Sequence, residues 1–117
     1  MPRSVLAYLS DIVEACDSIE VTLLNVDIDT YLENRTIRSA IEREFTIIGE
    51  AVNAIGRLDP DVADLISNAR KIVGFRNQLV HDYPAIKDEV VWAIAGHDAP
   101  VLRDECRRLI DEVGTAD

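Results

Sequence analysis

The feature that most constrains this 117-residue chain is a long series of apolar residues at helical spacing. Its members follow one another at steps of three or four positions: Ile37, Ile41, Phe45, Ile48, Val52, Ile55 and Leu58. Such spacing places them on one face of a helix, whereas a half-buried strand would alternate apolar and polar residues. We therefore expect a long helix over residues 36–57. Gly49 and Gly56 inside it each cost about 1 kcal/mol relative to alanine, and we expect them to allow close helix packing.

Further helices are predicted on both sides of this one. Ser4 can cap a helix over residues 5–24, and a connector over residues 25–30 leads to a short helical turn at Tyr31 and Leu32. Asp59 followed by proline is typical of a helix start, which predicts a short amphipathic segment as far as Ile66.

The second half of the chain continues the helical pattern. We expect a helix from about Asn68 to His81, because Pro84 disfavours the α conformation at the residue before it. A fourth helix is expected over residues 86–95, and Asp98 can cap a fifth helix that continues to Val113. The sequence thus predicts an all-α, antiparallel bundle of four to five helices, as a single domain over residues 1–117.

The composition narrows the class of protein further. Hydrophobic residues make up 48% of the chain, which is enough for one core, and no apolar run approaches the roughly 20 residues of a membrane span. Asp11 and Glu14 interrupt any signal-peptide core, so we expect a cytoplasmic protein.

Cys16 and Cys106 lie on apolar helical stripes, which favours buried thiols over a disulfide. Neither metal-ligand spacing nor a phosphate-binding loop is present, so no metal or other cofactor is expected.

The charge is unevenly distributed along the sequence. The chain carries a formal net charge of −10, which is unfavourable for general nucleic-acid binding. Residues 68–81, however, contain Arg70, Lys71 and Arg76 and no acid, so this stretch is +3 and the remainder is −13. Any contact with a polyanion is therefore expected in this stretch.

The same stretch ends in a group of residues that can carry chemistry: Arg76, Asn77, His81 and Tyr83. A guanidinium can hold a phosphate through two hydrogen bonds, and a histidine can transfer protons near neutral pH. Together they can cleave RNA without a metal, by attack of the ribose 2′-hydroxyl on the adjacent phosphorus. Arg76 and His81 are about 140° apart around a regular helix, so either fraying near Tyr83 or a second protomer must bring them together.

Plainer interpretations exist for each of these residues. His81 can simply bond the last carbonyls of its helix, and Arg76 can be a solvated surface group. Asn77 can orient Arg76 or face solvent, and Tyr83 can stack on a base or cover the end of the bundle. The spacing alone does not choose between these alternatives.

The motif resembles the R-x4-H-x-Y signature of the HepT-type ribonuclease toxins, which belong to the HEPN family. Arg76 to Tyr83 matches it, including the polar residue after the arginine. Residues 43–51, 71–77 and 90–92 also resemble the corresponding helices of that family, so the likeness covers most of the chain in order.

The resemblance implies several further properties. It implies a homodimer in which the two motif helices line one cleft, so that Arg76 and His81 of both subunits act on RNA and not on DNA. It also implies a type II-like toxin–antitoxin pair with a minimal nucleotidyltransferase antitoxin, which adds AMP to the motif tyrosine, here Tyr83. A phosphate attached there would compete with RNA for Arg76.

Two hypotheses about function follow. In the first, the chain is a metal-independent endoribonuclease toxin with Arg76 and His81 as catalytic residues, Asn77 as a supporting residue and Tyr83 as the site of AMP addition. In the second, it is a non-catalytic interaction module that binds a nucleotidyltransferase partner or a nucleotide. Whether Glu50 or Asn53 contributes to the site is open at this stage.

Overall fold

The computed structural model describes residues 3–81 and 87–116, and these residues form helices and connecting turns without a strand. The helices are α1 (Val5–Thr22), α2 (Ile28–Glu33), α3 (Arg35–Leu58), α4 (Pro60–Asp64), α5 (Ala69–His81) and α6 (Asp88–Ala116). The predicted all-α bundle is confirmed, with α1, α3, α5 and α6 as its long members. Tyr83, the predicted modification site, lies outside the described residues.

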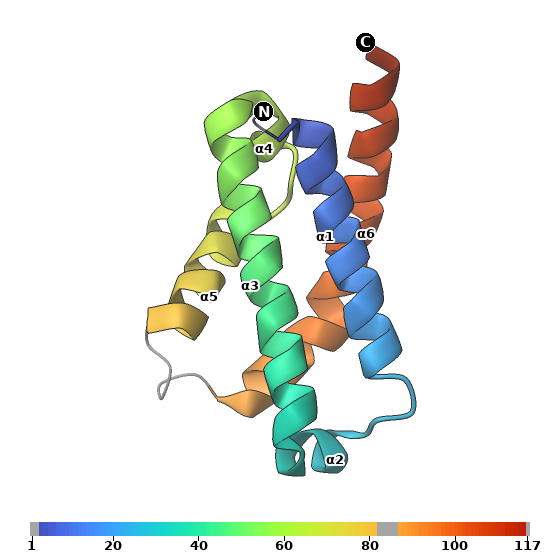
Figure 1. The fold of residues 1–117 in the computed structure, drawn as a ribbon, viewed down its shortest axis with the longest axis vertical. Coiled ribbons are helices and arrows are strands. Elements are labelled where there is room, and N and C mark those ends of the chain that lie inside the picture. Colours follow the sequence, from blue (N-terminus) through green and yellow to red (C-terminus); the bar gives the residue numbers. More distant parts are fainter. Residues whose placement is uncertain (1–2, 82–86, 117) are drawn as a thin grey trace.

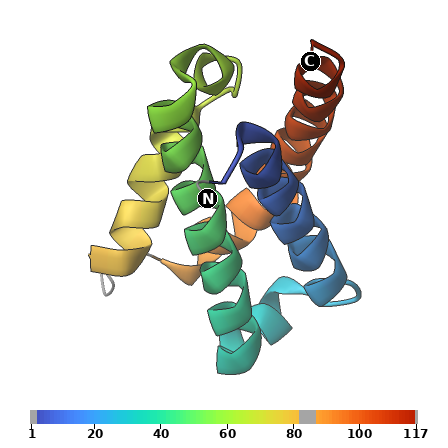
Figure 2. The same ribbon diagram turned by 45° about the horizontal axis from the view of Figure 1, so that its top comes forward.

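The bundle is arranged around α3 (Figure 1). α1 packs along one side of α3 and α5 along the other, while α6 packs mainly on α1. Turning the molecule shows the first half of α6 crossing behind α3, with its second half beside α1 (Figure 2). Among the described helices, α5 therefore has α3 as its main neighbour.

The predicted apolar stripe of α3 faces the core along most of its length. Five of its members are buried: Ile41, Phe45, Ile48, Val52 and Ile55. Ile37 is partly buried, whereas Leu58, the last residue of α3, is 49% exposed. Buried residues of α1 and α6, including Ile12, Cys16, Val91 and Cys106, complete the core.

Polar side chains fix the starts of the first four helices. The Ser4 hydroxyl accepts a hydrogen bond from the amide of Ala7 at 3.1 Å, and the Asp59 carboxylate accepts one from Val62 at 3.3 Å. Both residues are N-caps as predicted, and each satisfies an amide that a helix start leaves unpaired. Asn68 adopts φ 63°, a left-handed conformation that separates α5 from the short α4 segment before it.

The prediction of two helices after residue 86 is wrong, because α6 continues through Pro100. Asp98 is not a helix cap, because it and His97 before it are both exposed residues inside the helix. Proline in a helix interior costs about 3 kcal/mol. That cost is offset by core packing, since buried positions continue at helical spacing across the proline: Val91, Ala95, Ala99, Leu102, Cys106 and Leu109. α6 changes direction between its first and its second half (Figure 1).

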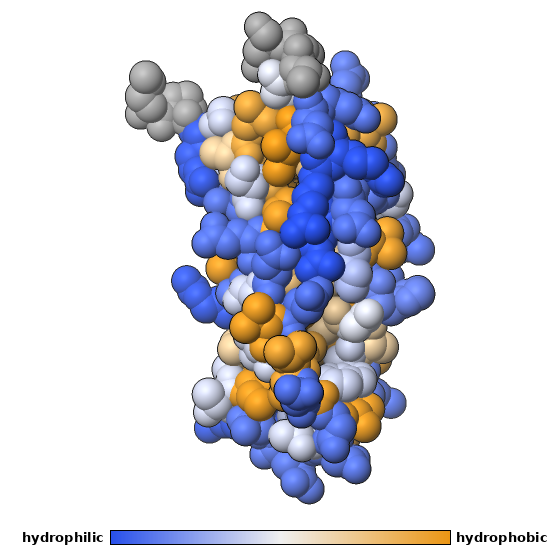
Figure 3. All heavy atoms as spheres, turned by 90° about the vertical axis from the view of Figure 1, so that its right-hand side faces the viewer, coloured by the Kyte–Doolittle hydropathy of each residue, from blue (hydrophilic) through white to orange (hydrophobic). Residues whose placement is uncertain are grey.

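Ion pairs join α1 and α6 on the surface of the bundle. Arg103 contacts Asp17 at 3.1 Å and Glu20 at 2.5 Å, and Arg107 contacts Asp17 at 3.3 Å. This side of the molecule combines strongly hydrophilic areas with hydrophobic ones (Figure 3). Among the described residues, no helix is both long enough and apolar enough to cross a membrane.

Cys16 and Cys106 are free, buried thiols, as their positions on apolar stripes predicted. Burial raises the pKa of each thiol to about 12 from the ordinary value of 9.0. The folded protein therefore keeps both thiols protonated and shielded at neutral pH.

We expect neither cysteine to react with a thiol-specific disulfide reagent at pH 8 in the folded protein, and both to react after denaturation. Because the unfolded chain loses these protons near pH 9 and the folded chain only near pH 12, the free energy of unfolding should fall as the pH rises between those values. Fast labelling of the folded protein would contradict this burial.

Candidate active site

The candidate site begins with a close contact between α3 and α5. A Cβ atom built on Gly49 would lie 2.2 Å from Cβ and 2.5 Å from Cγ of Arg76. Only glycine allows the stem of Arg76 to lie this close to the backbone of α3. The expectation of close packing is therefore confirmed for Gly49. It is wrong for Gly56, where the space beyond the backbone is open.

The guanidinium of Arg76 is held by two neighbours. One terminal nitrogen donates to the Glu50 carboxylate at 3.0 Å, and the other donates to the Asn77 side-chain oxygen at 3.0 Å. The Arg76 side chain is 26% exposed, and its Nε is buried and has no hydrogen-bond partner within the described part of the chain. Arg76 is thus a partly buried, oriented cation rather than a freely solvated group.

His81 is the last residue of α5 and is exposed. α5 is helical from Ala69 to His81, so no fraying before His81 changes its direction relative to Arg76. At 100° per residue the two side chains point about 140° apart, whereas Asn77 and His81 differ by only about 40°. One protomer therefore brings Arg76 and Asn77 together but does not bring His81 to the Arg76 guanidinium.

A polar hollow of about 370 Å³ lies beside Arg76. Its lining comes from three helices: Tyr8 of α1; Gly49, Glu50, Asn53, Ala54 and Arg57 of α3; and Val73, Arg76 and Asn77 of α5. Glu50 and Asn53, left open by the sequence, are both part of it. Arg57 was missed, although its helical spacing from Glu50 and Asn53 indicates one face of α3. Tyr8 was also missed, because only the tertiary fold brings α1 to this place.

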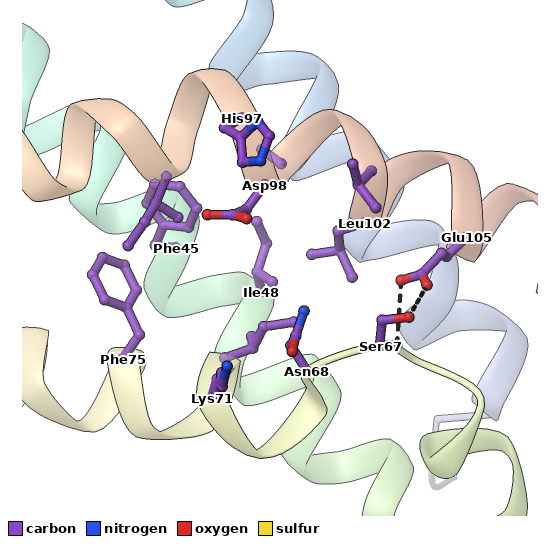
Figure 4. Close-up of a pocket in the computed structure, with 14 residues that line it drawn as sticks. Phe45, Ile48, Ser67, Asn68, Lys71, Phe75, His97, Asp98, Leu102 and Glu105 are labelled. Carbon is purple, nitrogen blue, oxygen red and sulfur yellow. Dashed lines mark hydrogen bonds between the residues drawn. The ribbon is translucent and has the colours of Figure 1, made fainter.

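A second hollow, of about 480 Å³, lies between α3, α5 and α6 and includes neither Arg76 nor His81 (Figure 4). Its walls are mainly apolar, with Phe45 and Phe75 in edge-on contact at 5.3 Å between ring centroids. Glu105 accepts hydrogen bonds from the amide and hydroxyl of Ser67 at its edge. Across residues 3–81 and 87–114, no three His, Cys, Asp or Glu side chains gather as a possible metal site.

An all-α bundle with an Arg-Asn pair and a histidine at the end of the same helix agrees with the HEPN resemblance of the sequence. A family model described as "Ribonuclease HepT-like" matches residues 12–109. The match covers most of the chain, which therefore belongs to the HepT-like family of HEPN domains.

Several known proteins resemble the chain along nearly its whole length. A Thermococcus cleftensis protein named "Probable ribonuclease HepT" is 30% identical, and the alignment covers 93% of this chain and 98% of that protein. Two Methanocaldococcus jannaschii proteins, each named a "Putative RNase", are 32% and 27% identical; they cover 88% and 95% of this chain and 94% and 91% of their own length. No solved structure gives a significant match.

The Gly49 contact predicts opposite effects of the same substitution at two positions of α3. Gly49→Ala should lower the free energy of unfolding by about 1–3 kcal/mol, because the added methyl group meets the rigid stem of Arg76 and α5 must move. Gly56→Ala, with open space, should raise it by up to about 1 kcal/mol. Chemical denaturation measures both, and equal effects would contradict this account of the α3–α5 contact.

Proposed function

We propose that this protein is a toxin that cleaves RNA internally without a metal ion. The observation that carries the proposal is the oriented guanidinium of Arg76 beside a polar hollow, in a member of the HepT-like family. The names of its relatives support a ribonuclease function. The 2′-hydroxyl attacks the neighbouring phosphorus and the bond to the 5′-oxygen breaks, which leaves a 2′,3′-cyclic phosphate and a 5′-hydroxyl.

Arg76 is proposed to bind the scissile phosphate. Its planar guanidinium suits the growing charge on the phosphate oxygens, and Asn77 holds it from its own helix. Glu50 now occupies one of its nitrogens, but the Glu50 side chain is 59% exposed and is free to turn into solvent when a phosphate arrives. A phosphate of RNA is thus expected to replace the Glu50 carboxylate at the guanidinium of Arg76.

His81 is proposed to transfer the protons. It accepts the proton of the 2′-hydroxyl, or donates one to the departing 5′-oxygen, because an imidazole can act as a general base or a general acid. Its exposure at the end of α5 leaves it accessible to substrate. DNA lacks the attacking hydroxyl and is not a substrate.

A homodimer is proposed to complete the site. Because α5 is helical as far as His81, Arg76 and His81 of one chain point in different directions. If two α5 helices line one cleft, Arg76 of one subunit and His81 of the other can reach the same phosphate. The cytoplasmic nucleotidyltransferase antitoxin would then silence the cleft by adding AMP to Tyr83, and the added phosphate would compete with RNA for Arg76.

The decisive experiment is cleavage of an end-labelled RNA by purified protein in excess EDTA. Intact mass must first show that no AMP is attached. We expect products with 2′,3′-cyclic phosphate ends and a loss of about 10²–10⁴-fold in His81→Ala, the usual contribution of a general acid or base. His97→Ala removes the other histidine, which lies on α6, and should cleave like the wild type.

Two results would count against the ribonuclease proposal. Cleavage that persists in His81→Ala would indicate a contaminating nuclease. No cleavage by the unmodified wild type would favour the alternative, a non-catalytic module that binds the nucleotidyltransferase or a nucleotide.

The shared cleft can be tested separately by mixing two inactive variants. Arg76→Ala and His81→Ala, unfolded together and refolded, form mixed dimers in which one chain supplies Arg76 and the other His81. We expect the mixture to recover a substantial fraction of wild-type cleavage, whereas neither variant alone does. Absence of recovery in a mixture that mass spectrometry shows to contain mixed dimers would mean that each site is built within one chain.

A further inference from the structure

The polar hollow extends beyond the residues that the proposed cleavage uses. Its lining also includes Asn53 and Arg57, which follow Glu50 on α3, and Tyr8 of α1. Arg57 is exposed, and no ion pair involving it is found among residues 3–81 and 87–116. A second guanidinium therefore stands in the same hollow as Arg76 without a counter-ion in this part of the chain.

The chemistry of this lining is that of a nucleotide site. Two guanidinium groups suit phosphates, the amides of Asn53 and Asn77 can donate and accept hydrogen bonds, and the ring of Tyr8 can stack on a base. Among the described residues of the lining, Glu50 is the only acid, and it is already paired with Arg76. On a chain of net charge −10, this hollow is a local positive site.

Two further hollows among the described residues do not offer this combination. The one in Figure 4 has mainly apolar walls and a single lysine, Lys71. The third, of about 410 Å³, includes Arg103, but that guanidinium already contacts both Asp17 and Glu20. A phosphate would have to displace two carboxylates there.

We propose that the hollow between Tyr8, Asn53 and Arg57 is the subsite for the nucleotide next to the scissile phosphate of single-stranded RNA. Arg57 binds the neighbouring phosphate, Tyr8 stacks on the base, and Asn53 bonds the base edge or the ribose. The inference rests on the proposed ribonuclease function, because it takes Arg76 as the site of the scissile phosphate.

The size and the lining both favour a single, unpaired nucleotide. The volume of about 370 Å³ is near the lower end of the range for small-ligand pockets, roughly 300–1,000 Å³. Stacking on an aromatic ring requires an unstacked base, which single strands and loops provide and duplexes do not. The guanidinium of Arg3 lies 5.0 Å from the centroid of the Tyr8 ring and is paired with Asp11 at 2.7 Å, so the charge available to a phosphate comes from Arg57 and Arg76.

The test measures binding rather than cleavage. A fluorescent single-stranded hexanucleotide RNA is titrated into the full-length His81→Ala protein over a range of salt concentrations, with and without Arg57→Gln. We expect Arg57→Gln to raise Kd about five-fold or more. The slope of log Kd against the logarithm of the salt concentration should fall by about 0.7, the contribution of one phosphate contact on a single strand. Arg108→Gln removes an exposed arginine of α6 outside the three hollows and should change neither.

The aromatic contact has its own pair of variants. Tyr8→Leu should raise Kd about five-fold or more, because stacking on a base is lost, and Tyr8→Phe should keep most of the affinity. In the protein that retains His81, Arg57→Gln should raise the KM for RNA cleavage much more than it lowers kcat. Thermal unfolding of each variant shows whether a loss comes from the fold.

The outcomes separate this proposal from the proposed function. If the wild type cleaves RNA but folded Arg57→Gln and Tyr8→Leu bind like their controls, the subsite is wrong and the ribonuclease stands. If the wild type does not cleave but both variants lose affinity for the hexanucleotide, the proposed subsite is supported and the proposed ribonuclease function is wrong. A wild type that neither binds nor cleaves single-stranded RNA overturns both.

Discussion

The close approach of α3 and α5 at Gly49 is the contact on which the candidate site depends. α5 has α3 as its main neighbour, so the depth to which it packs there decides where its side chains lie. The missing Cβ at Gly49 lets the stem of Arg76 rest against α3. The guanidinium then meets Glu50, the next residue of α3, and Asn77 of its own helix. The close packing at Gly49 thus determines where the positive charge of Arg76 lies in the site.

The acidic composition of the chain does not conflict with a local anion site. Charges on a protein surface are screened over about 8 Å at physiological salt, so distant carboxylates have little effect on a phosphate held at Arg76. A partly buried guanidinium, by contrast, acts in a less polar environment and already has its geometry fixed. Because α5 contains no acidic residue, its side chains do not repel a phosphate bound at Arg76. Local placement, and not net charge, decides what this surface can bind.

Periodicity predicted most of the fold because most helices here bury one continuous stripe. α3 differs from its predicted range by one residue at each end. α6 was divided wrongly because Asp98 and Pro100 give a strong local signal for a helix start, while the packing that carries the helix past them is tertiary. For the site, the sequence motif identified Arg76, Asn77 and His81 as candidate residues. It could not show the Arg76–Glu50 pair or bring Tyr8 to α3, since both depend on how helices pack.

The unbroken helix from Ala69 to His81 also has a consequence for the proposed homodimer. Between the directions of Arg76 and His81 lies the side of α5 that carries Asn77, and next to His81 lies Gly74, where a Cβ would meet open space. A second α5 can approach such a surface closely, but both helices carry Arg70, Lys71 and Arg76 without an acid, so they repel each other. On the proposed mechanism the RNA phosphate lies between them and neutralises that repulsion. Substrate binding and closure of the cleft would then stabilise each other, because one anion contacts cations of both subunits.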